Sequence, residues 1–284
     1  MNRFADKLLY ILVALAVAVL LAYSYVWVQI ETRMTRVYDV PLIDVSVSDD
    51  PAVLAEGERQ AWIHGCFWCH GNQLQGKPYF INGARGVKAV APNLTYKARD
   101  NSPAEMARAI RHGIKADGTS LQPAMPSFAF YNMSDEQTGA LISYIRSVPV
   151  VDGPEGEFTL WPIGKIRTLQ GIVPPNLADL IDHTAARTPS EYESGSIEHG
   201  RYLAESVCTE CHSDNGNLRV PGTPDLAIAR AYNKEQFVRL IRTGVALGER
   251  EIDYHMVEVA EYRYIYFTDE EVDALFKYFH RPLN

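Results

Sequence analysis

The sequence predicts an all-α protein in which one N-terminal transmembrane helix precedes two tandem copies of a small helical unit. Three observations support this fold class. An uncharged stretch lies near the N-terminus, at residues 8–30. A Cys-x-x-Cys-His pentapeptide occurs twice and uses all four cysteines of the chain. Helix-capping patterns of the first half recur in the second half at a nearly constant distance, which indicates an internal repeat.

The uncharged stretch follows a short polar segment, residues 1–7. At about 1.5 Å per residue, a helix over 8–30 crosses a hydrocarbon core of roughly 30 Å. Tyr10 at one end and Trp27 at the other suit the two membrane interfaces. The alternative is a cleaved signal peptide, but its apolar core is normally about 7–15 residues long. We therefore expect a single-pass anchor in the inner (cytoplasmic) membrane, with the basic N-terminus in the cytoplasm and the remainder in the periplasm.

The remaining chain divides by composition into four segments. A tether over 31–50 is biased to extended backbone by its X-Pro pairs. A first domain covers 51–148 and a second covers 191–284. Between them, 149–190 holds six prolines and is expected to be an ordered linker with one short helix within 166–183.

Capping residues predict the helices of the first domain. Asp50 and Pro51 open a helix that runs towards Cys66. Ser102-Pro-Ala-Glu105 is a capping box, and its helix ends at Gly113. Ser134 caps a third helix that stops before Pro149. Residues 71–86, rich in glycine, are expected to form a loop.

The second half repeats this order. The matching pairs are Gly57 and Gly200, Pro92-Asn-Leu94 and Pro224-Asp-Leu226, Ser102–Gly113 and Asn233–Gly244, Ser134–Gln137 and Thr268–Glu271, and Tyr144 and Tyr278. Two copies of one helical unit explain these pairs better than chance.

Each copy begins with a Cys-x-x-Cys-His motif, Cys66–His70 or Cys208–His212. This spacing is typical of covalent c-type haem attachment, in which two thiols bind the haem and the following histidine binds iron. Cys66, Cys69, Cys208 and Cys211 are therefore expected to attach two haems, with His70 and His212 as proximal iron ligands. A zinc site is the alternative, but Cys69 and Cys208 are 139 residues apart. A thioredoxin-like motif lacks its βαβ context, and a disulfide in each pair leaves both histidines unexplained.

A haem in an electron carrier needs a sixth ligand, and methionine marks the cytochromes c. Met125 lies between Pro123 and Pro126, which stiffen its loop. Met256 lies 131 residues later, at the offset of the preceding helices. We expect these two as ligands. Core packing is the commoner role of methionine, and it is expected for Met106. Met133 and His255 remain rival ligands, and the other histidines are expected on the surface or in packing.

Charge is uneven along the chain, which has a net charge of −8. Residues 50–148 carry ten Lys/Arg and eight Asp/Glu, whereas 191–284 carry ten and seventeen. The overall sign argues against nucleic acid as a partner. The acidic second half predicts a basic redox partner with salt-sensitive steering, although acidity can also serve solubility alone.

These motifs make the sequence resemble class I cytochrome c domains in tandem, over about residues 50–284. More narrowly, the run Asp39–Gly57 and the stretch that follows Ser147-Val-Pro-Val150 are similar to membrane-associated cytochrome subunits of periplasmic alcohol, aldehyde and gluconate dehydrogenases. The resemblance implies all-helical haem domains whose first and last helices cross. Two departures stand out: those subunits commonly carry three haems rather than two, and no proline follows Met256.

Three functions follow from these expectations. The first is a membrane-anchored dihaem electron carrier, not an enzyme, between a respiratory or dehydrogenase donor and an acceptor; its redox partner would be a dehydrogenase, an oxidase or a soluble cytochrome. The second is an integral cytochrome subunit of a periplasmic dehydrogenase or terminal oxidase complex. The third, a dihaem peroxidase, needs an iron with an open sixth position, and two methionine candidates argue against it.

Overall fold

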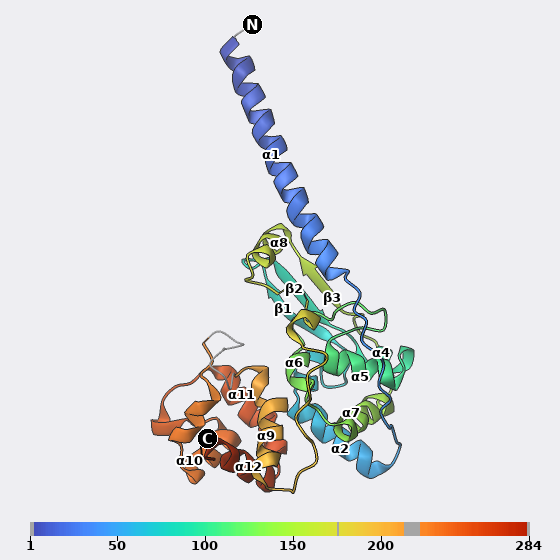
Figure 1. The fold of residues 1–284 in the computed structure, drawn as a ribbon, viewed down its shortest axis with the longest axis vertical. Coiled ribbons are helices and arrows are strands. Elements are labelled where there is room, and N and C mark those ends of the chain that lie inside the picture. Colours follow the sequence, from blue (N-terminus) through green and yellow to red (C-terminus); the bar gives the residue numbers. More distant parts are fainter. Residues whose placement is uncertain (1–2, 175, 213–221, 283–284) are drawn as a thin grey trace.

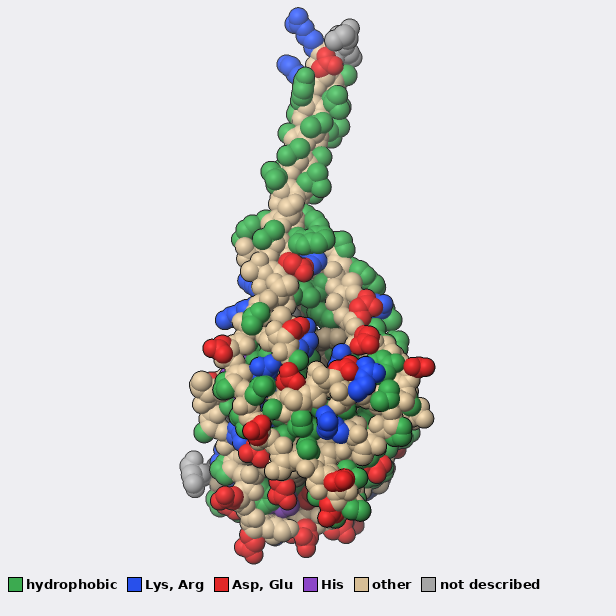
Figure 2. All heavy atoms as spheres, turned by 90° about the vertical axis from the view of Figure 1, so that its right-hand side faces the viewer, with side chains coloured by type: hydrophobic (Ala, Val, Ile, Leu, Met, Phe, Trp, Pro, Cys, Tyr) green, Lys and Arg blue, Asp and Glu red, His purple; other side chains and the backbone are tan. Residues whose placement is uncertain are grey.

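The computed structural model describes residues 3–174, 176–212 and 222–282. Helix α1 (Arg3–Met34) projects alone from a globular body, and its far end is the N-terminus (Figure 1). Of the described helices, only α1 is long and apolar enough to cross a membrane. It exceeds the predicted span of 8–30 by several residues at each end. Hydrophobic side chains cover it between its charged tip and the body (Figure 2).

The first half folds around α2 (Pro51–Ile63) and α7 (Asp135–Ser147), which cross closely. The predicted caps Asp50, Ser102 and Ser134 each accept a backbone N–H bond at a helix start. The other helices are α3 (Cys66–His70), α4 (Leu94–Asp100), α5 (Pro103–His112) and α6 (Ser127–Phe130). Their apolar faces meet in one core that includes Phe67, Met133 and Leu141.

The second half repeats this arrangement. Helices α9 (Ile197–Ser206) and α12 (Asp269–Phe279) cross as α2 and α7 do. Capping boxes open α10 (Lys234–Thr243) at Asn233 and α12 at Thr268, as predicted. The remaining elements are η2 (Cys208–Glu210), η3 (Leu226–Ala231), η4 (Leu247–Glu249), α11 (Tyr254–Tyr262) and η5 (Tyr264–Tyr266).

Gly57 and Gly200 explain why the two crossings are so close. A Cβ at Gly57 would lie 2.0 Å from the Ala140 carbonyl oxygen, and one at Gly200 would lie 2.0 Å from that of Ala274. Both distances are far inside van der Waals contact, so only glycine fits. The glycine pair found in the sequence repeat therefore marks equivalent helix crossings.

The all-α prediction is wrong in the first half. Strands β1 (Lys77–Asn82), β2 (Val87–Ala91) and β3 (Glu157–Leu160) form an antiparallel sheet in that order. The expected glycine-rich loop is a hairpin because β1 and β2 carry β-branched and aromatic residues that suit a pleated surface. The sheet also depends on β3, which comes from the linker and pairs Val87 with Leu160.

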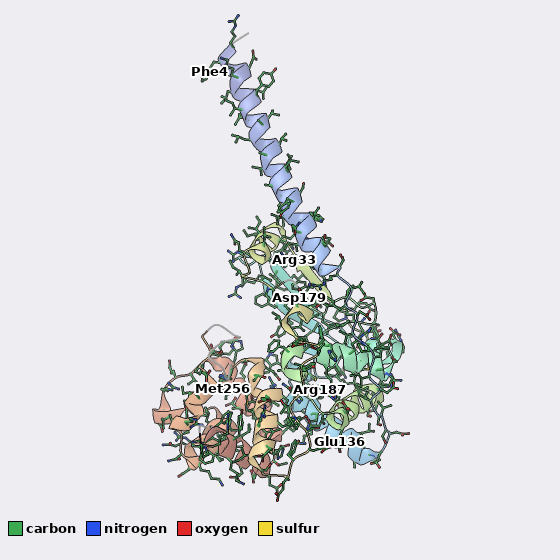
Figure 3. The ribbon with its side chains drawn as sticks, in the orientation of Figure 1. Phe4, Arg33, Glu136, Asp179, Arg187 and Met256 are labelled. Atoms are coloured by element: carbon green, nitrogen blue, oxygen red, sulfur yellow. The ribbon has the colours of Figure 1, made fainter. Side chains whose placement is uncertain are left out.

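The linker is built into the first half. After β3 it forms two short helices rather than the one expected, α8 (Pro162–Leu169) and η1 (Ala178–Leu180), and only η1 lies wholly within 166–183. The segment after α1 is also packed: Tyr38 donates its backbone N–H to Gly118, and Val40 and Val45 are buried. Figure 3 shows Arg33 at the base of α1 and Asp179 nearby in the linker.

Candidate haem sites

Both Cys-x-x-Cys-His segments follow directly from the end of a helix. Helix α2 stops at Ile63, and Gly65 turns the chain with a left-handed φ of 67° before α3 carries Cys66 to His70. The predicted continuous helix into Cys66 is therefore interrupted. In the second half α9 stops at Ser206, and η2 begins at Cys208. All four cysteines are free of disulfides.

The two proximal histidine candidates are held in the same way. Nδ1 of His70 lies 2.8 Å from the Pro92 carbonyl oxygen, and Nδ1 of His212 lies 2.8 Å from that of Pro224. A carbonyl accepts, so Nδ1 carries the proton and Nε2 keeps its lone pair for a metal. The two prolines that the sequence repeat aligns therefore lie at equivalent places beside the two histidines.

A cavity of about 680 Å³ opens against the first motif. Its lining includes Cys66, Cys69, His70 and Met125, with apolar walls from Leu94, Phe130 and Leu141. Tyr79, Ala91 and Phe158 show that all three strands contribute to it. Two attachment thiols, an oriented imidazole and a large apolar cavity fit a covalently bound haem.

Met125 and Met133 both line this cavity. Met133 is fully buried in the core, where it packs with Phe130 and Leu141. Met125 is only partly buried and lies in the turn just before α6. This difference favours Met125 over Met133 as the residue available to a ligand in the cavity.

Residues 213–221, next to His212, lie outside the described part of the chain, so the surroundings of the second motif are described only from the other side. Met256 lies on α11 and packs against the second core (Figure 3). Its rival His255 is exposed, and its Nδ1 lies 2.7 Å from Asp253 Oδ1. The geometry therefore favours Met256 over His255.

The two motifs face one another across the junction between the halves. Arg263 donates from Nε and Nη2 to the Ile63 carbonyl at 2.9 and 2.6 Å. Its Nη1 and Nη2 also donate to the Glu210 carboxylate, at 2.9 and 2.7 Å. Glu210 belongs to the second Cys-x-x-Cys-His motif. A Cβ at Gly65 would lie only 3.1 Å from the Arg263 guanidinium, so this glycine allows the approach.

The electrostatics confirm that the motifs are close. Burial, with Glu210 as a lesser contribution, raises the pKa of the Cys69 thiol to about 11. Burial, Cys69 and Cys211 raise the pKa of the Tyr79 hydroxyl to about 12. This β1 side chain therefore lies near a cysteine of each motif. Burial raises the pKa of Glu210, and the Arg263 guanidinium opposes that shift.

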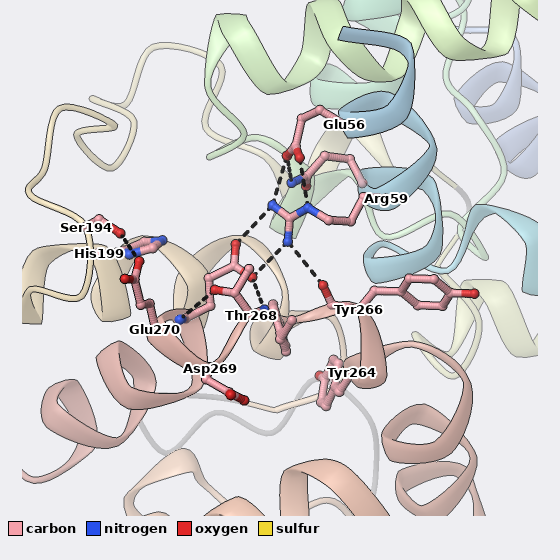
Figure 4. Close-up of polar contacts among 12 residues, drawn as sticks. Glu56, Arg59, Ser194, His199, Tyr264, Tyr266, Thr268, Asp269 and Glu270 are labelled. Carbon is pink, nitrogen blue, oxygen red and sulfur yellow. Dashed lines mark hydrogen bonds and ion pairs between the residues drawn. The ribbon is translucent and has the colours of Figure 1, made fainter. Parts of the chain in front are cut away.

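A second cluster of polar contacts reinforces the junction (Figure 4). Arg59 of α2 donates to Glu56 on its own helix, to Glu271 of α12 at 2.8 Å and to the Tyr266 carbonyl at 3.2 Å. The Trp62 and Tyr266 rings stack with centroids 5.1 Å apart. Ile63 is buried within the core of the second half. The two halves thus share both polar contacts and packing.

Sequence reasoning missed Arg263, Arg59 and Tyr79. Arg263 is a lone cation in the aromatic run Tyr262–Phe267, and Glu210 is a charge inside a haem motif. These two unusually placed charges were the only signs in the sequence that pointed to a buried ion pair. Arg263 and Glu210 are 53 residues apart, and Arg263 also contacts Ile63 of the first half, so no local pattern could show these contacts.

Comparison with known proteins agrees with this geometry. Residues 53–145 match the family described as cytochrome c oxidase, cbb3-type, subunit III. The matched range contains the first Cys-x-x-Cys-His motif, Pro92 and Met125. This segment is a c-type cytochrome domain.

Curated relatives extend the likeness over most of the chain. The fructose dehydrogenase cytochrome subunit of Gluconobacter japonicus is 25% identical over 262 residues, covering 79% of this chain and 51% of that protein. The alcohol dehydrogenase (quinone) cytochrome c subunit of Gluconacetobacter polyoxogenes is 27% identical over 273 residues, covering 81% and 56%. The gluconate 2-dehydrogenase cytochrome c subunit of Pantoea cypripedii is 26% identical, covering 59% and 40%.

These relatives confirm the resemblance to dehydrogenase cytochrome subunits that the sequence motifs indicated. The chain spans about half the length of the curated relatives it matches. Each of these relatives is named as a cytochrome subunit of a dehydrogenase.

Proposed function

We propose that this chain is a membrane-anchored dihaem cytochrome c that transfers single electrons at the periplasmic face of the inner membrane. Cys66 and Cys69 attach one haem and Cys208 and Cys211 the other. A c-type haem supplies an iron that gains and loses one electron. The observation that carries the proposal is the pair of matching sites: His70 and His212 each lie against a proline carbonyl, that of Pro92 or of Pro224.

The protein's own residues would hold the two haem irons: His70 with Met125 in the first half, and His212 with Met256 in the second. With both residues of each pair bound, an iron would have no free position for a substrate, which favours a carrier over an enzyme. Lys97 and Lys115 line the first cavity and supply positive charge for the two propionates.

The experiment is rapid mixing of the reduced protein with an oxidised, small basic redox protein, followed by haem absorbance. We expect both haems to be oxidised, with a rate that falls as salt rises. The screening length shortens from about 30 Å at 0.01 M to about 10 Å at 0.1 M, which weakens steering by the acidic second half. Oxidation of half of the haem absorbance, or of none, would overturn the proposal.

A second candidate is a cytochrome subunit of a larger periplasmic dehydrogenase or terminal oxidase complex. The names of the relatives favour the dehydrogenase form. Purification from the native membrane in mild detergent distinguishes the two. A stoichiometric flavin-, quinone- or metal-dependent dehydrogenase in the preparation supports the subunit function, and a lone cytochrome supports the free carrier.

A further inference from the structure

Helix α8 is packed with its apolar face outwards. Its buried residues are Gly164, Lys165 and Thr168, which are small or polar. Its exposed residues include Ile163, Ile166 and Leu169, at 43%, 37% and 41% exposure. A surface helix normally buries its apolar stripe and exposes its polar one. We therefore expect the exposed apolar residues of α8 to contact an apolar environment outside the chain.

The polar face of α8 is fixed firmly to the body and to α1. A Cβ at Gly164 would lie 2.1 Å from the Gly86 carbonyl oxygen, so the helix rests directly on the β1–β2 turn. Lys165 donates to Glu31 at 3.1 Å, and its ammonium lies 4.8 Å from the Trp27 ring centroid. These contacts hold the helix in one orientation, so the packing of its polar face fixes the apolar face towards the outside.

The partners of Lys165 set the level of α8 relative to a membrane. Glu31 is the first charged residue after the uncharged stretch 8–30. Trp27, four residues earlier, belongs to a residue type that favours the membrane–water interface. Helix α8 lies beside this end of α1, at the end of the body from which α1 projects (Figure 1). It is thus at the height of the lipid headgroups if α1 spans the bilayer.

We propose that α8 is a second membrane contact, lying in the lipid–water interface with Ile163, Ile166 and Leu169 towards the acyl chains. Trp161 and Ile172, at 37% and 58% exposure, flank the helix and extend this surface. Arg85 and Arg167, neither of them buried, add positive charge that suits anionic headgroups. The proposal rests on the anchor function of α1 given above.

Continuity with α1 favours lipid over a partner protein as the occupant. Ile30, Val26 and Met34 of α1 pack with Val87 and Leu160 of the sheet to which α8 is fixed. Hydrophobic side chains run from α1 onto this end of the body, whereas acidic and basic side chains gather further from it (Figure 2). A bilayer that surrounds α1 would reach α8 without any further component.

A second membrane contact would limit the tilt of the body and α1, which pack together, relative to the membrane plane. With α8 in the interface, the sheet stands on the membrane, and the second half lies at the far end of the body from α1 (Figure 1).

The test uses full-length holoprotein in vesicles of phosphatidylcholine and phosphatidylglycerol. A nitroxide is placed at Ile166→Cys, and its collision rates with oxygen and with a water-soluble nickel chelate are compared. Val17→Cys on α1 is the lipid control. Ile197→Cys, 39% exposed at the start of α9, is the water control. The native cysteines are blocked by haem, so the chain without an added cysteine should not be labelled.

We expect the oxygen-to-nickel ratio at residue 166 to exceed that at 197 several-fold and to approach that at 17. Equal ratios at 166 and 197, with a high ratio at 17, would overturn the membrane contact and leave the face for a partner protein. A low ratio at 17 would instead overturn the anchor. Labelling of the chain without an added cysteine would overturn haem attachment, so each failure has its own signature.

Discussion

In the first half a sheet lines the candidate haem site, whereas the described residues of the second half place no strand beside their motif. His70 is buried, and strands β1 to β3 line the cavity beside it. His212 is half-buried, and no strand lies in 191–212 or 222–282. On the proposed function, the same helical unit would serve two positions, one beside the anchor helix and one in the acidic region. We propose that the second site is the one that meets a soluble redox partner.

The largest expected effect separates the two methionine candidates from the core methionine. We expect Met125→Ala and Met256→Ala each to open one reduced haem to carbon monoxide, because each would remove a proposed iron ligand. Binding should be faster in the Met256 variant, since its site is more exposed. Flash photolysis measures both rates.

Met133→Ala is the matched control for that experiment. It should lose about 2–5 kcal/mol of stability, because it leaves a cavity in the core, yet bind no carbon monoxide. Unchanged carbon monoxide binding in Met256→Ala would remove that residue as a ligand. Binding in Met133→Ala would reverse the assignment in the first half.

The next effect concerns the junction between the halves. Arg263→Met leaves Glu210 buried without its cation, and breaking a buried pair costs about 3–5 kcal/mol. We expect the two halves to unfold in separate transitions, measured by denaturant titration with far-UV and haem signals. Arg239→Ala is the control, since its pair with Glu249 is exposed and long at 3.8 Å. A loss below about 1 kcal/mol in Arg263→Met would mean that the pair does not join the halves.

A third effect tests whether the two halves are truly equivalent at their helix crossings. Gly57→Ala and Gly200→Ala should destabilise by similar amounts, about 1–3 kcal/mol or more, because both force a Cβ into a backbone carbonyl. Gly171→Ala has open space and serves as the control, although its φ of 76° adds local strain. Tolerance of alanine at one crossing alone would break the structural equivalence.

The smallest effect compares two related ion pairs. Asp135 contacts buried Arg111 at 2.7 Å, whereas the Asp269 carboxylate, 2.7 Å from Arg242, is fully exposed. We expect Asp135→Asn to cost about 1–3 kcal/mol, since it leaves a buried guanidinium poorly paired, and Asp269→Asn less than about 1 kcal/mol. Thermal unfolding of both variants measures the difference. A larger loss in Asp269→Asn would contradict it.

The Asp135 pair also predicts a pH dependence. Burial raises the pKa of Asp135, but Arg111 and Arg187 outweigh it and hold the pKa below its usual value. A carboxyl with a depressed folded-state pKa stabilises fully above its unfolded pKa of about 4. That stability is lost as pH falls through the folded-state pKa. Unfolding midpoints of wild type and Asp135→Asn should therefore converge in acid.

These comparisons also show which features the sequence could predict. The predicted caps at Ser102, Ser134, Asn233 and Thr268 are confirmed because a cap depends only on residues within one turn. The sheet was missed because β2 needs β3, which lies some seventy residues away, to complete it. The histidine–carbonyl pairs were predictable because the repeat aligned Pro92 with Pro224. Arg263 was not, because its partners Ile63 and Glu210 come from different halves.

The central claim is that each half holds one covalent haem. The most direct measurement is the haem-to-protein ratio of the purified holoprotein, from the pyridine haemochrome spectrum and amino-acid analysis. The account predicts a ratio of two, falling to one in Cys208→Ala/Cys211→Ala with the Met125 site intact. A ratio of one in the wild type, unchanged in that double variant, would contradict it.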